Sequence, residues 1–308
     1  MKVAVIGAGV MGPGIAQTFL MGGHDATIVD ISEEALVKGL KEVEKCLRLM
    51  EDNELIAGAD DMFARLSYTG SMEEGVADAD LVIEAVPEKL EVKMMIYQQL
   101  DPICKPDAVI TSNTSSFPVS IVFDDFRPGN FFVSHFFNPP AINPLVEIVH
   151  NDKTDPEKVQ WLRAILEDCG KKPIVVNDYA LGFIINRMQM AMLREGLNLI
   201  EKGIISIDDM DTATKVGFGF KTAWQGMFET MDFIGLDTVD FSQSILLPDL
   251  YVGTEPSPIV KSLVEEGKLG LKSGEGFFKY GDEGEATQDR RFMMLVEQLK
   301  LYKQFGIV

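Results

Sequence analysis

The sequence predicts an α/β protein: a doubly wound sheet domain followed by a mostly α-helical domain. In the first half of the 308 residues, short β-branched runs alternate with amphipathic stretches, which is the pattern of βαβ units in a parallel sheet covered on both faces. After Asn177 the apolar residues recur at helical spacing over long segments instead. We therefore expect a sheet domain over residues 1–178 and a helical domain over residues 179–308.

Each strand of the first domain is expected where a β-branched run is bounded by turn residues. These runs are KVAVIG, DATIVD, ADLVIEAV, DAVITSN, FFVSHF and PIVV, and LVEIV is a further strand-like run. The helical segments between them are expected at about Pro13–Met21, Ser32–Leu49, Lys93–Leu100 and Pro156–Asp168.

The second domain is expected to begin near Tyr179 and to be mostly helical. Its first helix, expected over Phe183–Lys202, has apolar residues on more than one face. A small domain rarely covers such a helix alone, so we expect a homodimer contact through this domain. The tail Gln288–Val308 is expected to form a final amphipathic helix.

Composition excludes several classes of protein. The formal charge of −20 argues against a nucleic-acid partner, because phosphates need clustered Lys and Arg. No apolar run reaches the roughly 18 residues of a membrane span, and the N-terminus lacks a signal-peptide pattern, so a cytoplasmic protein is expected. Cys46, Cys104 and Cys169 are far apart and predict no disulfide framework and no metal site.

A glycine-rich turn lies between the first expected strand and the first expected helix. VAVIGAGVMGPG supplies Gly7, Gly9 and Gly12 in GxGxxG spacing, with Val10 and Met11 at the two variable positions before Gly12. Gly7 allows a tight turn, Gly9 admits a pyrophosphate, and Gly12 permits close packing of helix and strand. In this context the motif predicts a Rossmann-type dinucleotide site rather than a plain glycine turn.

The second expected strand ends in Asp30, about 18 residues after Gly12. A carboxylate there accepts hydrogen bonds from a ribose hydroxyl and repels a 2′-phosphate. The expected cofactor is therefore NAD rather than NADP.

His135 ends an apolar strand-like run, and Glu147 lies twelve positions further on in LVEIV. If the two runs are neighbours, Glu147 can orient the His135 imidazole, which then acts as the general base for hydride transfer to a nicotinamide. Taken alone, a histidine among phenylalanines is more often a core residue, but the upstream dinucleotide site favours the catalytic pair.

Several motifs together resemble the L-3-hydroxyacyl-CoA dehydrogenase family. They are GAGVMGPGIA, EAVPEKLEVK, SNTSS, HFFNPP with PLVEIV, GFIINR and GLKSGEGFFKY, in the family's order from Met1 to about Tyr280. The resemblance implies an NAD-dependent enzyme of fatty acid metabolism, with His135 as base and Glu147 as its partner.

The resemblance also implies further site residues. Ser115 and Asn138 resemble the hydroxyl and amide near the reacting oxygen, and Asn186 resembles the asparagine of the second domain. Glu88, Lys93 and Asn113 resemble residues around the nicotinamide ribose. In the alternative reading, Ser115 caps the next segment, Asn186 only starts a helix, and Glu88 and Lys93 are surface charges.

Three departures from the family pattern concern the substrate. Leu181 stands where many family members have a proline before GF. In the second domain, FKTAWQGMFETMDFIGLD replaces the family's usual Pro-Met-Gly-Pro-like run. Within it, Trp224, Met227 and Phe228 are candidate pocket walls or core residues. The segment from Glu44 to Asp80 holds ten acidic residues against three basic ones, which disfavours the phosphates of coenzyme A.

Three functions remain open at this point. The leading prediction is oxidation of a short L-3-hydroxyacyl-CoA to the 3-oxo form, or the reverse. The second keeps the mechanism on a small free hydroxy acid, as in the similar L-gulonate dehydrogenase branch, or on carnitine. The third is an inactive NAD-binding structural or sensor protein, against which the His135 and Glu147 pair argues.

Overall fold

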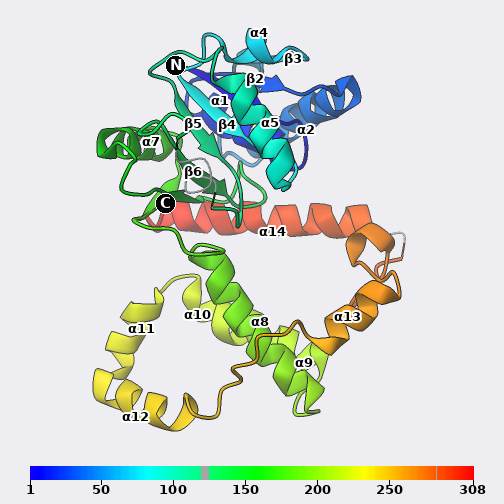
Figure 1. Ribbon diagram of the computed structural model, residues 1–308. Helices are drawn as coiled ribbons and strands as arrows, with labels where there is room; N and C mark the ends of the chain where they lie inside the picture. Colours follow the sequence, from blue (N-terminus) through cyan, green and yellow to red (C-terminus); the bar gives the residue numbers. More distant parts are fainter. Residues whose placement is uncertain (119–124, 282) are drawn as a thin grey trace. The chain divides into compact units, whose positions relative to one another are not determined.

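The computed structural model describes residues 1–118, 125–281 and 283–308 (Figure 1). They form two compact units, one of Met1–Asn186 with Arg290–Val308 and the other of Arg187–Asp289. These units differ from the expected ranges 1–178 and 179–308 at the C-terminal end, because the last helix packs on the first unit. The expected fold class, a Rossmann-type sheet followed by a helical region, is confirmed.

One eight-stranded sheet organises the first unit, in the order β3-β2-β1-β4-β5-β6-β7-β8. Neighbouring strands are parallel except β6 and β7, which are antiparallel. The order reverses between β1 and β4, and open sheets of this kind bind ligands at the carboxyl ends of the strands there. The strands are β1 (Lys2–Ile6), β2 (Asp25–Val29), β3 (Leu66–Thr69), β4 (Leu81–Glu84), β5 (Val109–Ser112), β6 (Phe131–Phe136), β7 (Leu145–Val149) and β8 (Lys172–Val176).

Helices cover both faces of the sheet, as the continuous apolar runs of the strands require. On β1, Val3 and Val5 belong to the core beneath α1, α2 and α7, whereas Ala4 and Ile6 belong to the core beneath α4 and α5. The helices of this unit are α1 (Gly12–Met21), α2 (Glu33–Asp52), α3 (Ala59–Phe63), α4 (Met72–Val76), α5 (Leu90–Leu100), α7 (Pro156–Asp168) and, from Arg290 on, α14 (Gly284–Gln304).

The C-terminal helix α14 closes a third apolar cluster. Val296 and Leu299 are buried there with Cys46 and Met50 of α2 and with residues of the loop between β6 and β7. Two lysines of α14 also hydrogen-bond to the segment after α2, Lys300 to the Asn53 side chain and Lys303 to the Leu55 carbonyl. The helix is therefore an integral part of the first unit.

The second unit is helical within its described residues. It contains α8 (Ile185–Glu201), which starts in the first unit, α9 (Ile207–Thr212), a π-helical stretch (Ala213–Gly219), α10 (Phe220–Thr222), α11 (Met227–Ile234), α12 (Leu236–Leu246), α13 (Pro258–Glu265) and a 3-10 turn (Leu271–Ser273). No helix in the described part of the chain combines the length and apolarity needed to cross a membrane.

Three short elements between Ala59 and Val76 were not expected from the sequence. These are α3, β3 and α4, each of four or five residues. Strand β3 pairs only with β2 at the edge of the sheet and is partly exposed, so it lacks the apolar run that marks the inner strands. By contrast, the LVEIV run does form a strand, β7.

Candidate active site

The three glycines of the turn after β1 have the distinct roles expected of them. Gly7 has a φ of 110°, and a Cβ atom on it would lie 2.6 Å from the Ala85 carbonyl oxygen. A Cβ on Gly12 would overlap the Gly7 carbonyl oxygen, so helix α1 approaches the strand more closely than any side chain permits. Gly9 has nothing within 4 Å of such an atom. The open space above Gly9 suits the approach of a pyrophosphate.

Asp30 lies directly after β2 and points its carboxylate at this turn. Oδ2 accepts a hydrogen bond of 2.7 Å from the Ala8 backbone N–H, and Oδ1 accepts one of 2.9 Å from Ser32. Val10, beside the same turn, is 83% exposed, and Met11 is the N-cap residue of α1. A carboxylate fixed beside a glycine-rich turn and a free helix N-terminus is an arrangement that fits the ribose and pyrophosphate of a dinucleotide.

His135 and Glu147 face each other across the antiparallel strands β6 and β7. They are directly paired in the register, and Nδ1 of His135 lies 2.8 Å from Oε2 of Glu147. Both side chains are buried, with 6% and 0% exposure. An ionised carboxylate can only accept, so Nδ1 carries the proton and Nε2 keeps its lone pair. The pair expected from the sequence is therefore formed, with Nε2 as the basic atom.

The second oxygen of Glu147 is held by the start of helix α8. Oε1 accepts hydrogen bonds of 3.0 Å from the backbone N–H groups of both Ile184 and Ile185. The preceding Gly182 and Phe183 have φ values of 76° and 50°, and this turn directs the two N–H groups at the carboxylate. Three donors thus hold this carboxylate in a fixed position at the start of α8.

Aromatic rings surround the imidazole. The ring of Phe137 lies 4.4 Å from that of His135 and the ring of Phe183 lies 5.6 Å away, measured between centroids. Phe183 is fully buried. These rings restrict the movement of the imidazole and keep water away from its sides.

Ser115 and Asn186 belong to a second group of predicted site residues that the structure brings together. The Asn186 amide donates to the Ser115 carbonyl at 3.3 Å, and the Ser115 backbone N–H donates to Glu88 at 3.1 Å. The Phe117 N–H donates at 2.9 Å to the hydroxyl of Thr114 rather than to that of Ser115. The Ser115 hydroxyl, 3.5 Å from Glu88, is weakly engaged.

Lys93 is buried, so its alternative reading as a surface charge was wrong. It is 1% exposed and pairs with Glu84 at 2.8 Å and with Glu88 at 3.1 Å. Burial alone would raise the pKa of Glu88, but the Thr114 hydroxyl and the Lys93 ammonium together hold that pKa below its usual range. Glu88 thus stays ionised beside Ser115.

Glu84 anchors this network and was not expected from the sequence. The last residue of β4, it is fully buried and accepts four hydrogen bonds, from the Val86 N–H, Lys93, the Tyr97 hydroxyl and the Ser112 hydroxyl, at 2.6–2.9 Å. Lys93 and Tyr97 are one helical turn apart on α5. Two polar residues at that spacing on an otherwise apolar face were the available signal in the sequence for a buried polar network.

Asn113 and Asn138 bracket β6. The Asn113 side-chain oxygen accepts from the Phe136 N–H at 2.8 Å, next to His135. Asn138 follows the strand, and its carbonyl oxygen accepts a hydrogen bond of 3.3 Å from Arg291 of α14. Asn113 thus binds the backbone next to His135, Asn138 lies three residues after His135, and Arg291 is an unexpected neighbour of Asn138.

The loop from Pro139 to Pro144, between β6 and β7, is held by a buried lysine. Lys171 is 3% exposed and donates through Nζ to the carbonyl oxygens of Pro140 and Asn143. Burial lowers the pKa of Lys171 to about 7. The hydroxyl of Thr18 on α1 also donates to the Pro140 carbonyl at 3.3 Å. The prolines expected to stiffen this loop therefore act together with a tertiary clamp.

The candidate pocket walls Trp224, Met227 and Phe228 lie in the second unit. All three are exposed there, Phe228 to 78%. Their assignment to a substrate pocket stays a prediction.

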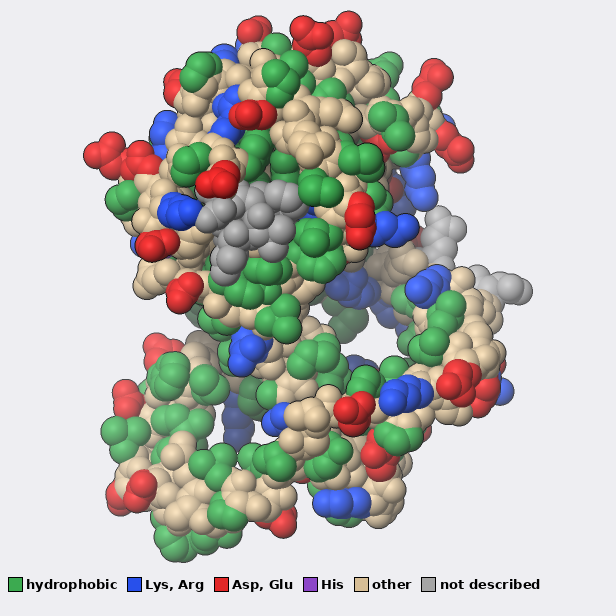
Figure 2. All heavy atoms as spheres, in the orientation of Figure 1, with side chains coloured by type: hydrophobic (Ala, Val, Ile, Leu, Met, Phe, Trp, Pro, Cys, Tyr) green, Lys and Arg blue, Asp and Glu red, His purple; other side chains and the backbone are tan. Residues whose placement is uncertain are grey.

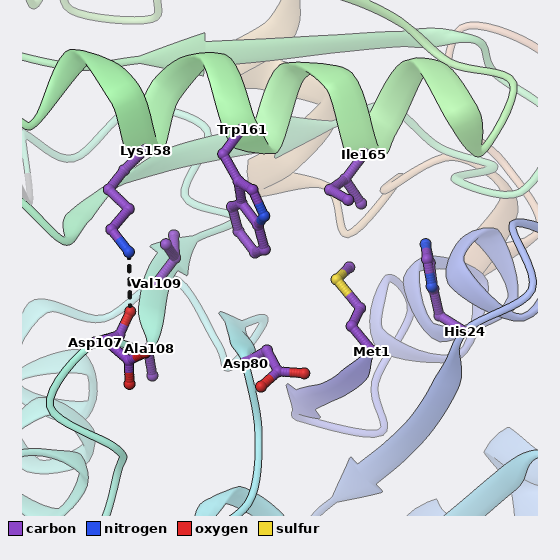
Figure 3. A pocket seen from close by; sticks show the side chains of 9 residues that line it. All are labelled: Met1, His24, Asp80, Asp107, Ala108, Val109, Lys158, Trp161 and Ile165. Carbon is purple, nitrogen blue, oxygen red and sulfur yellow. Dashed lines mark hydrogen bonds between the residues drawn. The ribbon is translucent and has the colours of Figure 1, made fainter.

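A cavity of about 360 Å³ lies at the opposite edge of the sheet, where β1, β4 and β5 begin (Figure 3). His24 and Trp161 point into it from separate segments, and Lys158 donates to the Asp107 carbonyl at its rim. Burial lowers the pKa of His24, which favours the neutral ring. This cavity is at the amino ends of the strands and is separate from the His135 site.

We predict that Asp30→Asn weakens NADH binding about 10-fold or more, because hydrogen bonds to a charged group contribute roughly 1.5–3 kcal/mol. NADPH binding should weaken less or improve, since the repulsion of a 2′-phosphate is removed. Fluorescence titration with both nucleotides measures this, with Glu33→Gln as the matched control on α2. Equal losses for NADH and NADPH would contradict the ribose assignment.

Comparison with known proteins agrees with the geometry. The chain matches the model of the 3-hydroxyacyl-CoA dehydrogenase NAD binding domain over residues 2–179 and that of the C-terminal domain over residues 182–280. A probable 3-hydroxybutyryl-CoA dehydrogenase of Deinococcus radiodurans is 36% identical over 285 residues, which cover 91% of this chain and all of that protein.

Two solved structures resemble the chain at 30% identity. One is a 5-formyl-3-hydroxy-2-methylpyridine 4-carboxylic acid 5-dehydrogenase, described as NAD⁺ dependent, with a TM-score of 0.92 over 98% of both chains. The other is (S)-3-hydroxybutyryl-CoA dehydrogenase of Ralstonia eutropha, with a TM-score of 0.74 over 91% of this chain and 98% of that one. The chain therefore belongs to the 3-hydroxyacyl-CoA dehydrogenase family of NAD-dependent oxidoreductases.

Proposed function

We propose that this protein oxidises a hydroxyl group on a small substrate that carries a free carboxylate, with NAD as the hydride acceptor. The observation that carries the proposal is the likeness to the pyridine carboxylate dehydrogenase, at a TM-score of 0.92 over 98% of both chains. The free hydroxy acid, which was the second of the functions open from the sequence, thus becomes the leading one.

In the proposed reaction, His135 removes the proton of the substrate hydroxyl through Nε2. NAD, when bound at the glycine-rich turn, would supply the acceptor for the hydride on the carbon that bears this hydroxyl. Glu147 stabilises the imidazolium that forms, and the N–H groups of Ile184 and Ile185 hold the carboxylate in place through its other oxygen. Proton transfer to a positioned base typically contributes a factor of about 10²–10⁴ to the rate.

Ser115 and Asn138 are proposed to hydrogen-bond to the reacting oxygen, where negative charge develops. The weak contact of the Ser115 hydroxyl with Glu88 leaves it able to turn toward a substrate. Asn186 supports this arrangement indirectly, since its amide already donates to the Ser115 carbonyl.

A short-chain L-3-hydroxyacyl-CoA is the second candidate substrate. The 36% identity to the Deinococcus radiodurans protein, over its full length, favours it. The net charge of α2 and α3 opposes it, because the two helices carry eight acidic residues against four basic ones. One of the basic residues, Arg48, is already paired with Glu44 and Asp60. The phosphates of coenzyme A would find no free positive charge at Arg48 and several carboxylates around it.

We also propose a homodimer formed through the second unit. Figure 2 shows hydrophobic side chains spread over the surface around α11 and α12. Eight of the apolar residues of this unit are more than 60% exposed, far more than a lone soluble domain usually presents: Ile204, Val216, Phe220, Phe228, Phe233, Leu236, Phe241 and Val252.

We predict that light scattering at micromolar concentration gives twice the mass of the chain, and that Phe233→Asp shifts the protein toward monomers. A monomeric wild-type protein would contradict the dimer.

The cytoplasmic location also stays a proposal, supported by three buried free thiols, and cell fractionation would check it.

The proposed substrate class is tested by a panel of substrates with the wild-type protein. We predict that NADH forms from NAD with L-gulonate, L-carnitine, 3-hydroxybutyrate or a hydroxymethylpyridine carboxylate, and that NADH is not consumed with acetoacetyl-CoA. The measurement is NADH absorbance. Turnover of acetoacetyl-CoA with none of the free acids would establish the second candidate instead.

For the base, we predict that His135→Gln lowers kcat by at least about 10²-fold and leaves NADH affinity nearly unchanged, because the glutamine amide cannot accept the proton. Steady-state kinetics on the substrate found in the panel and NADH fluorescence titration measure the two quantities. His150→Gln is the control, since the His150 ring contacts the carbonyl oxygen of the neighbouring Asn151. Normal activity per folded molecule of His135→Gln would show that His135 is a core residue only.

A further inference from the structure

Arg291 places a cation beside the loop that follows the catalytic histidine. Its Nη2 donates to the Asn138 carbonyl oxygen at 3.3 Å. The side chain is exposed, and among the side chains that the structure describes no carboxylate forms an ion pair with it. A guanidinium has five N–H donors in a planar fork. Most of this fork is therefore free to bind an anion.

The position of Arg291 is fixed by the packing of α14. Val296 and Leu299, further along the helix, are buried against Ala141 and Ile142 of the loop after Asn138. The loop itself is clamped by Lys171 through two carbonyl oxygens. Because buried residues hold the backbones of both the helix and the loop, little backbone freedom is lost when a ligand binds there.

The short backbone separation between His135 and Asn138, to which Arg291 is hydrogen-bonded, suits a small substrate. His135 and Asn138 are three residues apart, so their Cα atoms are separated by at most about 11 Å. One compact substrate can therefore present its hydroxyl to His135 and an anionic group to Arg291. The net charge of −20 repels an anion from most of the surface. Arg291, beside Asn138, supplies a local positive charge that attracts one.

The helix that carries Arg291 lies outside the matched part of the family's C-terminal domain, which ends at residue 280. By contrast, an alignment over 98% of the chain must include most of the 21 residues of α14. The solved structure with a TM-score of 0.92 is therefore aligned with this helix.

We propose that Arg291 is a specificity-determining residue whose guanidinium binds the substrate carboxylate beside Asn138, while His135 takes the hydroxyl proton. This inference rests on the proposed function, since it assigns a binding partner to the carboxylate of that substrate class. The competing role for Arg291 is purely structural, as a tie between α14 and the loop. Only the binding role makes the effect of a substitution depend on the charge of the ligand.

The test uses the NADH-saturated protein and two matched probes, pyridine-4-carboxylate and its neutral amide, pyridine-4-carboxamide, with binding measured by calorimetry. The wild type should bind the carboxylate more tightly than the amide. Arg291→Gln should bind the carboxylate about 10- to 100-fold more weakly, with the amide and NADH unchanged, because a charge-assisted pair is lost. Arg291→Lys should recover part of the preference.

The control is Arg290→Gln. Arg290 is the neighbouring exposed arginine, and it points about 100° away around the helix. It should retain the full preference for the carboxylate. Circular dichroism and NADH affinity confirm that each variant is folded.

Three results would overturn the inference: a wild type that binds the carboxylate no better than the amide, an Arg291→Gln variant that keeps the preference, or an equal loss in Arg290→Gln. The proposed function fails separately, if the wild type turns over acetoacetyl-CoA and none of the free acids. Turnover of a free acid with an unchanged KM in Arg291→Gln would keep the function and remove the role of Arg291.

Discussion

The carboxylate of Glu147 is the interaction on which the rest of the site depends. One oxygen accepts from the His135 imidazole and the other accepts from two backbone N–H groups at the start of α8. Three donors converge on this buried group, so an ionised carboxylate satisfies all of them, whereas a glutamine amide would turn an N–H donor toward another donor. The same residue thus fixes the tautomer of the base and the point where α8 begins.

This shared carboxylate explains the unusual backbone before α8. Phe183 adopts a positive φ, which costs a non-glycine residue of order 1 kcal/mol or more. The free-energy cost of this conformation is offset by two interactions. The Phe183 ring is buried against the imidazole, and the next two N–H groups donate hydrogen bonds to Glu147. Helix α8 also carries Asn186 to the Ser115 loop, so a single turn organises both groups of site residues.

Much of the fold and part of the site could be predicted from the sequence because they depend on local pattern. The inner strands have continuous apolar runs, and the glycine spacing identifies the cofactor turn. His135 and Glu147 lie on strands joined by a short proline-rich loop, which makes antiparallel pairing the natural outcome. The contacts of Lys171 and Arg291 could not be predicted, because they join segments 31 and 153 residues apart. Lys93 was assigned to the site only by resemblance, and its buried partner Glu84 lies on a different element, β4.

The central claim, that His135 and Glu147 act as one unit, is tested most directly by a double-mutant cycle on the rate of single-turnover hydride transfer. The variants are His135→Gln, Glu147→Gln and the double variant, each saturated with NAD and substrate. If Glu147 acts through His135, the double variant should be about as slow as His135→Gln alone. Penalties that multiply, so that the double variant is slower than His135→Gln by the full factor lost in Glu147→Gln, would show that the two residues act independently.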